Sequence, residues 1–460
     1  MRPVTVRIAC VQLRARPLVD AERAMHDVLA GIATSAAHGA KIAVLPECSY
    51  PGYVLLKRTL PGGARGSERA LARVAQAAKR SSIDVCIGMA SQASDGSVRN
   101  EAIYVDRTGS VVARYAKIFL WNFDRSWFAP GRAVDAFDTS YGRLGMMICA
   151  DGRMPEIARS LARRGAWLIL DPTAWVGTGP QYECMPNPQV EFMMRVRARE
   201  NGVWIAAADK CGSEHDAVHY VGSSMIVAPD GEQIARASAD LPTVIVSDVA
   251  IARAPRPVVA ALVPSERRAL RSAYHRARSK NAPRFRLGVL QGALGKGRAA
   301  ALAALRAQGA EAIVEAVRGA TDVRRVFAAI RGLRVVVVEG AAMFAPEPAR
   351  AAALRGADVI VWSKAPERDD VRDTARTRAL ENRVFVVAAL ARIGKGEATS
   401  LVADPDGRVI GEALVGKPSG FVALIDAAAA RDKRVVPGTD AMADRIPKAF
   451  ALFDAKRGAS

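Results

Sequence analysis

Short apolar runs alternate with amphipathic stretches over the first half of the chain. Apolar runs of this length predict buried strands, and apolar positions that recur every three or four residues predict helices. The predicted order is strand 1–12, helix 18–38, strand 41–47, helix 67–80, strand 83–90 and a hairpin at 101–114 that turns at 106–109. Strands and helices that alternate in this way are typical of an α/β fold.

One apolar run, at 144–148, ends at Cys149 and passes directly into a helical pattern after Gly152 and Pro155. We expect a thiol at such a corner to be exposed beside the start of a helix. There the helix dipole would lower the thiol pKa, and backbone N–H groups could receive an oxyanion. A lone cysteine is more often a small buried residue, so its neighbours decide between the two interpretations.

Two charged residues hold equivalent places. Glu47 ends the apolar run at 41–46, and Lys117 lies in the apolar frame at 114–120. Sites of open α/β sheets form where the carboxyl ends of the strands meet. Glu47, Lys117 and Cys149 therefore form one candidate site.

Several motifs occur in the order found in the nitrilase superfamily of carbon–nitrogen hydrolases, whose triad is Glu, Lys and Cys in that chain order. They are Leu45-Pro46-Glu47, Pro51-Gly52-Tyr53, Tyr115-Ala116-Lys117, Phe128-Ala129-Pro130-Gly131, Cys149-Ala150-Asp151, Pro155-Glu156, Asp171-Pro172-Thr173-Ala174-Trp175, Arg197-Ala198-Arg199-Glu200-Asn201-Gly202, Gly222-Ser223-Ser224 and Pro229-Asp230-Gly231. Residues 4–250 thus resemble that superfamily, which implies a four-layer αββα sandwich.

The resemblance also implies a mechanism. Cys149 attacks an amide carbon, Glu47 carries protons, Lys117 and the N–H of Ala150 hold the oxyanion, and water clears the thioester. This chemistry needs no cofactor and no metal. Cys149-Ala150-Asp151 is similar to the Cys-x-Asp of amidases and carbamoylases, whereas nitrilases usually carry Cys-Trp-Glu. A small-molecule amide or N-carbamoyl substrate is therefore favoured over a nitrile, and a non-catalytic two-unit scaffold is the alternative from another class.

Other site residues are open to two interpretations. Asp124 lies near the place where most family members carry a second glutamate, and a loop-surface aspartate is the alternative. Arg153 is a candidate carboxylate clamp, because guanidinium binds carboxylates through two hydrogen bonds, or else a structural partner of Glu156. Aromatic side chains could wall an apolar pocket or pack in the core: Tyr53, Trp127 and Trp175.

Two further motifs do not fit their usual function. Cys211, His215 and His219 have ligand-like spacing but no fourth ligand nearby, which argues against zinc. The stretch at 292–297 has the wrong Gly-to-Lys spacing for a phosphate loop. The six cysteines have no regular spacing, and no run of 18 apolar residues occurs. We expect reduced thiols in a soluble cytoplasmic protein without a membrane segment.

The formal net charge of +20 raises the question of nucleic-acid binding. Most of the excess is arginine scattered along alanine-rich helices, which argues against it. Only residues 253–286 concentrate the charge, with ten Lys or Arg against the single acid Glu266. A solvated linker helix explains that segment better, because few aromatic residues lie among the charges.

The second half of the chain repeats the first. Residues 376–382 echo 195–201, residues 349–357 echo 158–166, and residues 405–407 echo 229–231. In this alignment Val317 takes the place of Glu47 and Gly340 that of Cys149. Since the stretch between those two positions is also far shorter, no segment corresponds to the one with Lys117.

The predicted organisation follows from this repeat. It comprises a catalytic domain at 1–252, a basic linker at 253–284, a truncated and catalytically dead copy of the fold at 285–445, and a tail at 446–460. We expect the two copies to pair as an intrachain pseudo-dimer, with a homo-oligomer as the alternative.

Overall fold

The computed structural model describes residues 4–56, 59–177, 187–215, 218–251, 255–274, 282–292, 297–316, 325–328, 330–366, 368–390 and 398–447. The chain divides into two compact units, Met1–Pro257 and Val258–Ser460. Val317 and residues 448–460 of the predicted tail lie outside the described residues.

The first sheet of the first unit has, among its described residues, eight strands in the order β11-β10-β1-β2-β3-β4-β5, with β14 paired to β1. Their bounds are β1 (Thr5–Arg14), β2 (Ile42–Val44), β3 (Asp84–Gln92), β4 (Val98–Val105), β5 (Val111–Ala116), β10 (Lys210–Glu214), β11 (Val218–Val221) and β14 (Thr243–Ala250). The strands β1, β2 and β3 run parallel, so their carboxyl ends meet at one edge.

The second sheet of this unit has six strands in its described part, in the order β13-β12-β9-β8-β7-β6. Their bounds are β6 (Ala136–Thr139), β7 (Gly142–Met146), β8 (Leu168–Pro172), β9 (Trp204–Ala208), β12 (Met225–Val227) and β13 (Gln233–Arg236). The strands β7, β8 and β9 are parallel and largely buried, as the apolar run before Cys149 predicts.

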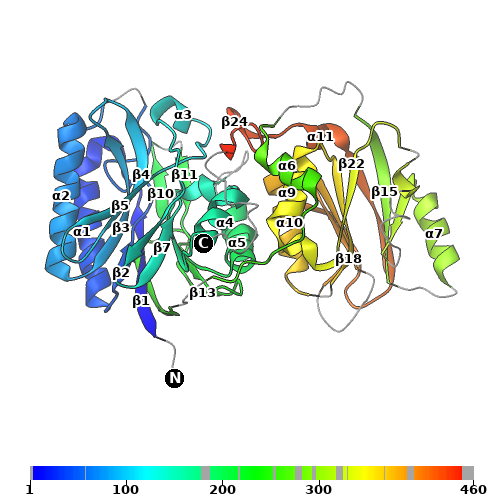
Figure 1. Ribbon diagram of the computed structural model, residues 1–460, viewed down its shortest axis with the longest axis horizontal. Coiled ribbons are helices and arrows are strands. Elements are labelled where there is room, and N and C mark those ends of the chain that lie inside the picture. The colour runs from blue at the N-terminus through cyan, green and yellow to red at the C-terminus, as the bar shows by residue number, and fades with distance from the viewer. Residues whose placement is uncertain are drawn as a thin grey trace. The chain divides into compact units, whose positions relative to one another are not determined.

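Helices cover the outer faces of the two sheets (Figure 1). The helices α1 (Ala21–Ala37) and α2 (Gly63–Ser81) pack their apolar stripes on β1 and β3. The strands β1, β2 and β3 contact β8 and β9, so the two sheets face each other. The helices α4 (Pro155–Arg163) and α5 (Met194–Asn201) pack on β7, β9 and β12. The predicted four-layer αββα sandwich is confirmed.

The second unit repeats this order with fewer elements. Its strands are β15 (Arg284–Gln291), β16 (Ala312–Glu315), β17 (Val335–Glu339), β18 (Val359–Ala365), β19 (Phe385–Leu390), β20 (Leu401–Ala403), β21 (Val409–Glu412), β22 (Ser419–Asp426), β23 (Arg434–Val436) and β24 (Thr439–Asp440). Its helices are α6 (Pro264–Arg271), α7 (Arg298–Ala307), α9 (Pro346–Leu354), α10 (Val371–Asn382) and α11 (Ala427–Arg431).

Strand pairing shows that the second unit is a copy. The strand β15 pairs parallel with β16 and antiparallel with β22, as β1 does with β2 and β14. The strands β17 to β21 repeat the pairing of β7, β8, β9, β12 and β13. In the first unit, residues 45 to 141 separate β2 from β7, but only residues 316 to 334 separate β16 from β17. That short span cannot hold counterparts of α2, β3, β4 and β5, so the copy is truncated as predicted.

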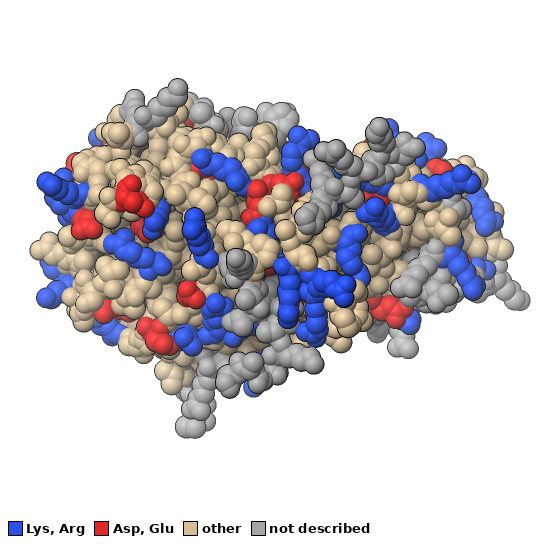
Figure 2. Space-filling view, turned by 45° about the horizontal axis from the view of Figure 1, so that its top comes forward, with Lys and Arg blue, Asp and Glu red and all other residues tan. Residues whose placement is uncertain are grey.

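The predicted helices, strands and hairpin of the first unit all form, with Gly109 at φ +89° in the hairpin turn. Part of the segment predicted as a linker forms α6, which packs against α9 in the second unit. No helix within the described ranges is long and apolar enough to cross a membrane. On the face drawn in Figure 2, Lys and Arg are spread widely, with acidic side chains among them.

Candidate active site

The three predicted residues follow three strands of the first unit. Glu47 follows β2, Lys117 follows β5, and Cys149 begins the short helix η2 (Cys149–Arg153) after β7. Gly88 on β3 permits the turn at Glu47, because a Cβ there would lie 2.5 Å from the Glu47 Cα. The structure brings all three residues together in the interior, where the charges of Glu47 and Lys117 act on the Cys149 thiol.

The two oxygens of Glu47 differ. Oε1 accepts hydrogen bonds from Lys117 Nζ at 2.6 Å and from Asn100 Nδ2 at 2.6 Å. Oε2 is buried and has no hydrogen-bond partner among the described residues. A buried carboxylate oxygen without a donor is costly, and its lone pairs are open to a hydrogen-bond donor of a bound molecule.

Asp124 begins α3 (Asp124–Trp127) and is fully buried, so the alternative of a surface aspartate is wrong. Its Oδ2 accepts Lys117 Nζ at 2.7 Å, and its Oδ1 accepts the Tyr53 hydroxyl at 2.7 Å. Burial lowers the pKa of the Lys117 ammonium, but the Asp124 and Glu47 carboxylates outweigh it, and the pKa lies well above its ordinary value. Lys117 therefore stays charged.

The Cys149 thiol is not the exposed, acidic group that the corner predicts. The residue is 8% exposed, and burial raises the pKa of its thiol well above the ordinary value, with a further increase from Glu47 and an opposing effect of Lys117. Burial raises the thiol pKa more than the dipole of the short helix η2 can lower it, because removing a thiolate from water costs more free energy than the dipole of a five-residue helix supplies. The thiol rests protonated and needs a base.

The backbone of Cys149 is held in the left-handed region at φ +48°. Its N–H donates to Asp171 Oδ1 at 2.8 Å, and its carbonyl accepts Gln189 Nε2 at 2.7 Å. A non-glycine residue in this region is strained and persists only where its surroundings hold it. Asp171 and Gln189 supply that support.

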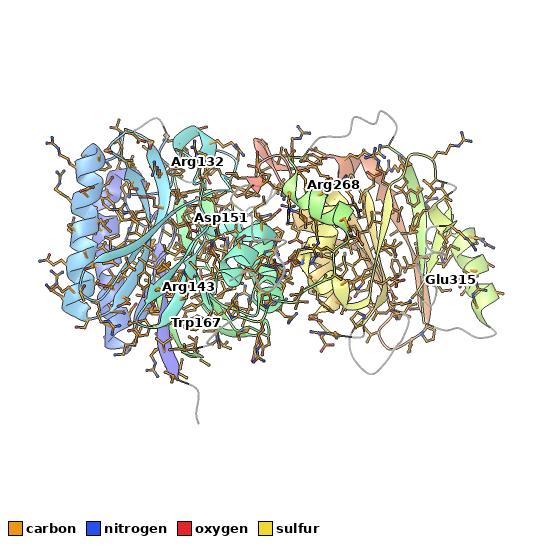
Figure 3. The ribbon with its side chains drawn as sticks, in the orientation of Figure 1. Arg132, Arg143, Asp151, Trp167, Arg268 and Glu315 are labelled. Atoms are coloured by element: carbon orange, nitrogen blue, oxygen red, sulfur yellow. The ribbon has the colours of Figure 1, made fainter. Side chains whose placement is uncertain are left out.

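Asp151 joins the lysine segment to the cysteine segment and lies in the interior of the first unit (Figure 3). It accepts the N–H groups of Ile118 at 3.2 Å, Phe119 at 2.8 Å and Ile148 at 3.1 Å, together with the Tyr115 hydroxyl at 2.8 Å. Burial raises the pKa of Asp151 to about 6, although these hydrogen bonds oppose the shift. The Cys-x-Asp motif thus has a structural role beside the site.

A cavity of about 300 Å³, including its open mouth, reaches Cys149. It is lined by Tyr53, Trp121, Cys149, Ala150, Arg153, Ala174, Trp175, Val176, Asn187 and Gln189. The predicted wall residues Tyr53 and Trp175 are among them. Trp127 is not, since it packs on Phe123, with ring centroids 4.8 Å apart, and its contact with substrate stays a prediction.

Arg153 places a cation in this cavity while being only 6% exposed. Its Nε donates to Gln189 Oε1 at 3.2 Å, and its guanidinium lies 4.4 Å from the Trp121 ring centroid. Sequence reasoning missed Trp121 and Gln189. Trp121 lies four residues after Lys117, and Gln189 lies eight residues before Arg197, but nothing local shows that the two side chains meet at Arg153.

The described residues contain no group of three or more His, Cys, Asp or Glu placed to hold a metal ion. Cys211 lies on β10 and His219 on β11, where the register pairs Cys211 with Val221 and Ser213 with His219.

In the second unit a glycine stands at the position that corresponds to Cys149. Gly340 begins η5 (Gly340–Phe344) at φ +56°, as Cys149 begins η2, so the corner keeps its shape without a thiol. Trp362 Nε1 donates to the Gly340 carbonyl at 2.7 Å, and the Trp362 ring packs edge-on to Phe344. Val317, aligned with Glu47, lies outside the described residues.

Known proteins resemble this chain over parts of its length. The sequence model of the carbon-nitrogen hydrolase family matches residues 7–255 and 322–434. Omega-amidase NIT2 of Homo sapiens is 30% identical over 238 residues, covering 47% of this chain and 79% of that protein. A Pseudomonas protegens protein described as a hydrolase in the pqqF 5' region is 33% identical over 244 residues, with coverages of 51% and 80%. Among solved structures, an amidase from Nesterenkonia sp. has 27% identity and a TM-score of 0.49, covering 54% of this chain and 92% of its own.

Proposed function

Because the chain belongs to the carbon–nitrogen hydrolase family, we propose that its first unit cleaves a small amide or N-carbamoyl compound through a thioester on Cys149. The observation that carries this proposal is the asymmetry of Glu47. One oxygen is fixed by Lys117 and Asn100, and the other has no hydrogen-bond partner in the part of the chain that the structure describes, in a site whose thiol is protonated. This is the arrangement that a general base and a covalent nucleophile require.

Acylation begins when Cys149 Sγ attacks the amide carbon and Glu47 Oε2 takes the thiol proton. The oxyanion that forms is held by Lys117 Nζ and the N–H of Ala150. When the C–N bond breaks, Glu47 returns the proton to the leaving nitrogen, and ammonia or an amine departs. The acyl group stays on the sulfur as a thioester.

Deacylation uses the same residues, with water in place of the thiol as the attacking group and the thiolate as the leaving group. Glu47 takes a proton from water, the hydroxide attacks the thioester carbon, and Lys117 again faces the oxyanion. The C–S bond breaks, the thiolate recovers the proton from Glu47, and a carboxylic acid leaves. Asp124 does not exchange protons in this scheme. It holds the ammonium of Lys117 in place and charged.

Arg153 supports a substrate whose far end carries a carboxylate. Its guanidinium lies in the cavity and is fixed by Trp121 and Gln189. A planar cation with little freedom left to lose binds a carboxylate well. We propose Arg153 as the carboxylate clamp, and Tyr53 and Trp175 as the apolar walls of the substrate cavity.

The test is ammonia release from amides, N-carbamoyl amino acids and nitriles, each with and without a terminal carboxylate. We expect turnover of an amide or N-carbamoyl compound with a carboxylate, and a large rise of KM in Arg153→Met for these substrates alone. Turnover of nitriles alone would contradict the proposed amide or N-carbamoyl substrate and show that the substrate is a nitrile. If no compound is turned over, the alternative of a non-catalytic two-unit protein holds.

We further propose that the two units pair within one chain as a pseudo-dimer, in place of a homodimer. The support is that both have the same fold, and that α4 and α9 are both retained. Light scattering should find the full chain monomeric. A protein ending at Pro257 should dimerise, aggregate or lose activity, because an apolar face would be uncovered. A truncated protein that stays monomeric, soluble and fully active contradicts the pairing.

A further inference from the structure

A second buried lysine–glutamate pair lies on β10, and the mechanism above does not use it. Lys210 Nζ donates to Glu214 Oε1 at 2.8 Å, with Glu214 fully buried and Lys210 3% exposed. Removing two charges from water costs several kcal/mol per ion, so a buried pair is weak evidence of a contribution to stability. This pair therefore calls for another explanation.

Glu214 also accepts hydrogen bonds from the segment that follows Glu47. Its Oε2 accepts the N–H groups of Val54 at 2.9 Å and Tyr53 at 3.2 Å. Residues 45–56 form no helix or strand, so no ladder of backbone hydrogen bonds fixes these N–H groups. The Glu214 carboxylate therefore holds the Tyr53–Val54 part of this segment, and the hydrogen bond from Lys210 holds the carboxylate in place.

Tyr53 connects the backbone held by Glu214 to Lys117. Its hydroxyl donates to Asp124 Oδ1 at 2.7 Å, and Asp124 Oδ2 accepts Lys117 Nζ at 2.7 Å. The ring is confined by aromatic neighbours whose centroids lie 5.7 to 6.5 Å away: Phe123, Trp127, Phe128 and Tyr220. Lys117 Nζ and Lys210 Nζ each lie 5.8 Å from the ring centroid. A shift of the Tyr53 backbone would therefore move the hydroxyl that holds Asp124.

We propose that Glu214 is a positioning residue that fixes Lys117 through Tyr53 and Asp124. This inference rests on the proposed function, since it assigns Glu214 to the geometry of the oxyanion-binding lysine. It also assigns Tyr53 a second role besides lining the substrate cavity. A misplacement of about 1 Å at a catalytic group can cost up to about 100-fold in rate.

A double-mutant cycle separates this role from a merely structural one. Glu214→Gln and Tyr53→Phe should each lower kcat about tenfold, since each breaks the same connection to Asp124. In the double variant kcat should fall no more than about twofold below the lower single variant. Effects that multiply to about 100-fold would show two independent roles and overturn the proposal. Wild-type kcat in Glu214→Gln would overturn it as well.

Asp84→Asn is the matched control. Asp84 is also buried, accepting a tyrosine hydroxyl (Tyr104, 2.7 Å) and a backbone N–H (Arg107, 2.9 Å), but it begins β3, at the opposite end from Glu47. This variant should lose thermal stability and keep wild-type kcat. A loss of kcat equal to that of Glu214→Gln would show that any buried carboxylate of this unit affects the rate, which would overturn the specific role of Glu214.

The same double-mutant cycle can be measured without substrate turnover. The rate of Cys149 alkylation by iodoacetamide is followed by mass spectrometry of the peptide that contains Cys149. Lys117 favours the thiolate, so its displacement should slow alkylation about tenfold in either single variant and no further in the double variant. This readout decides the proposal even if no amide is hydrolysed and the proposed function fails.

Should Glu214→Gln not fold, Glu214→Asp keeps the charge next to Lys210 but retracts the carboxylate, and the same non-additivity with Tyr53→Phe is expected. Multiplying effects would again overturn the proposal.

Discussion

Equivalent arginines hold the corner after β7 in the first unit and the corner after β17 in the second, although only the first corner carries a cysteine. In the first unit Arg197 Nε donates to the Gly152 carbonyl at 2.9 Å, and Arg197 Nη1 to Glu200 Oε1 at 2.8 Å. In the second unit Arg378 makes the same bonds to the Met343 carbonyl at 3.0 Å and to Glu381 Oε1 at 2.9 Å. The arginine therefore maintains the fold of the corner, and catalysis is a separate requirement.

A second shared contact supports this distinction. Gln12 on β1 and Gln291 on β15 each donate through Nε2 to two loop carbonyls and accept a serine N–H through Oε1. Neither glutamine lines a cavity described here. The second unit thus has the polar groups that hold the sandwich together. It differs from the first unit in the span between β16 and β17, which is too short for counterparts of α2, β3, β4 and β5, and in the glycine that stands where the first unit has Cys149.

The sharpest test exchanges the residues at the two corners. Cys149→Ala should lower kcat by at least about 1,000-fold, because the covalent step is lost and each tenfold is about 1.4 kcal/mol of barrier. Gly340→Cys should add no activity to that variant, since Val317 takes the place of Glu47 and the span between β16 and β17 is too short for a Lys117 counterpart. Ammonia release at saturating substrate measures both.

Cys86→Ala is the control for the first substitution, because Cys86 is a fully buried cysteine on β3. It should keep full activity. Residual turnover in purified Cys149→Ala would exclude the thioester mechanism, and turnover gained through Gly340→Cys would show that the second unit retains a base and an oxyanion site.

Removing the shared arginine tests whether its role is equal in both units. Arg197→Ala and Arg378→Ala should each destabilise their own unit by about 3–5 kcal/mol, since each removes a buried cation that is paired with a buried glutamate. Only Arg197→Ala should also lower kcat, because Arg197 holds the carbonyl of Gly152 in the turn that begins at Cys149. Hydrogen exchange read on peptides of each unit measures the stability, and ammonia release the rate. Equal losses of activity would mean that the second unit supports the site.

A smaller difference concerns Asp151, whose place in the second unit is taken by Ala342. Burial raises the pKa of Asp151 from its ordinary value of 3.8 to about 6, so between about pH 4 and pH 6 the folded protein binds a proton that the unfolded chain has released. The stability from this group is complete below about pH 4 and is lost as the pH rises through about 6.

Asp151→Asn should remove this dependence. The stability gap between wild type and variant should change by on the order of 2 kcal/mol across that window in denaturant unfolding of the first unit. Hydrogen exchange of peptides from the second unit should show no such change. A constant gap from pH 4 to pH 7 would contradict the raised pKa.

Local pattern was enough to predict the order of elements and the three central site residues. Strand and helix periods are local properties, and a charged or nucleophilic residue at the end of an apolar run is placed at the sheet edge by the strand itself. That is why Glu47, Lys117 and Cys149 could be read together. The repeat was also readable, because its two copies are compared within one sequence.

Only the tertiary structure decided how buried the site is and what supports it. Burial in the folded interior raises the pKa of the Cys149 thiol, and the five-residue turn that begins at Cys149 does not reveal that burial. Asp124 acts on Lys117 through an interior that the loop pattern does not reveal. Gln189 reaches Cys149 across 40 residues, and Glu214 reaches Tyr53 across 161. Partners so distant in sequence leave no periodic signal, because their contact depends on how two sheets and their connecting loops close around one interior.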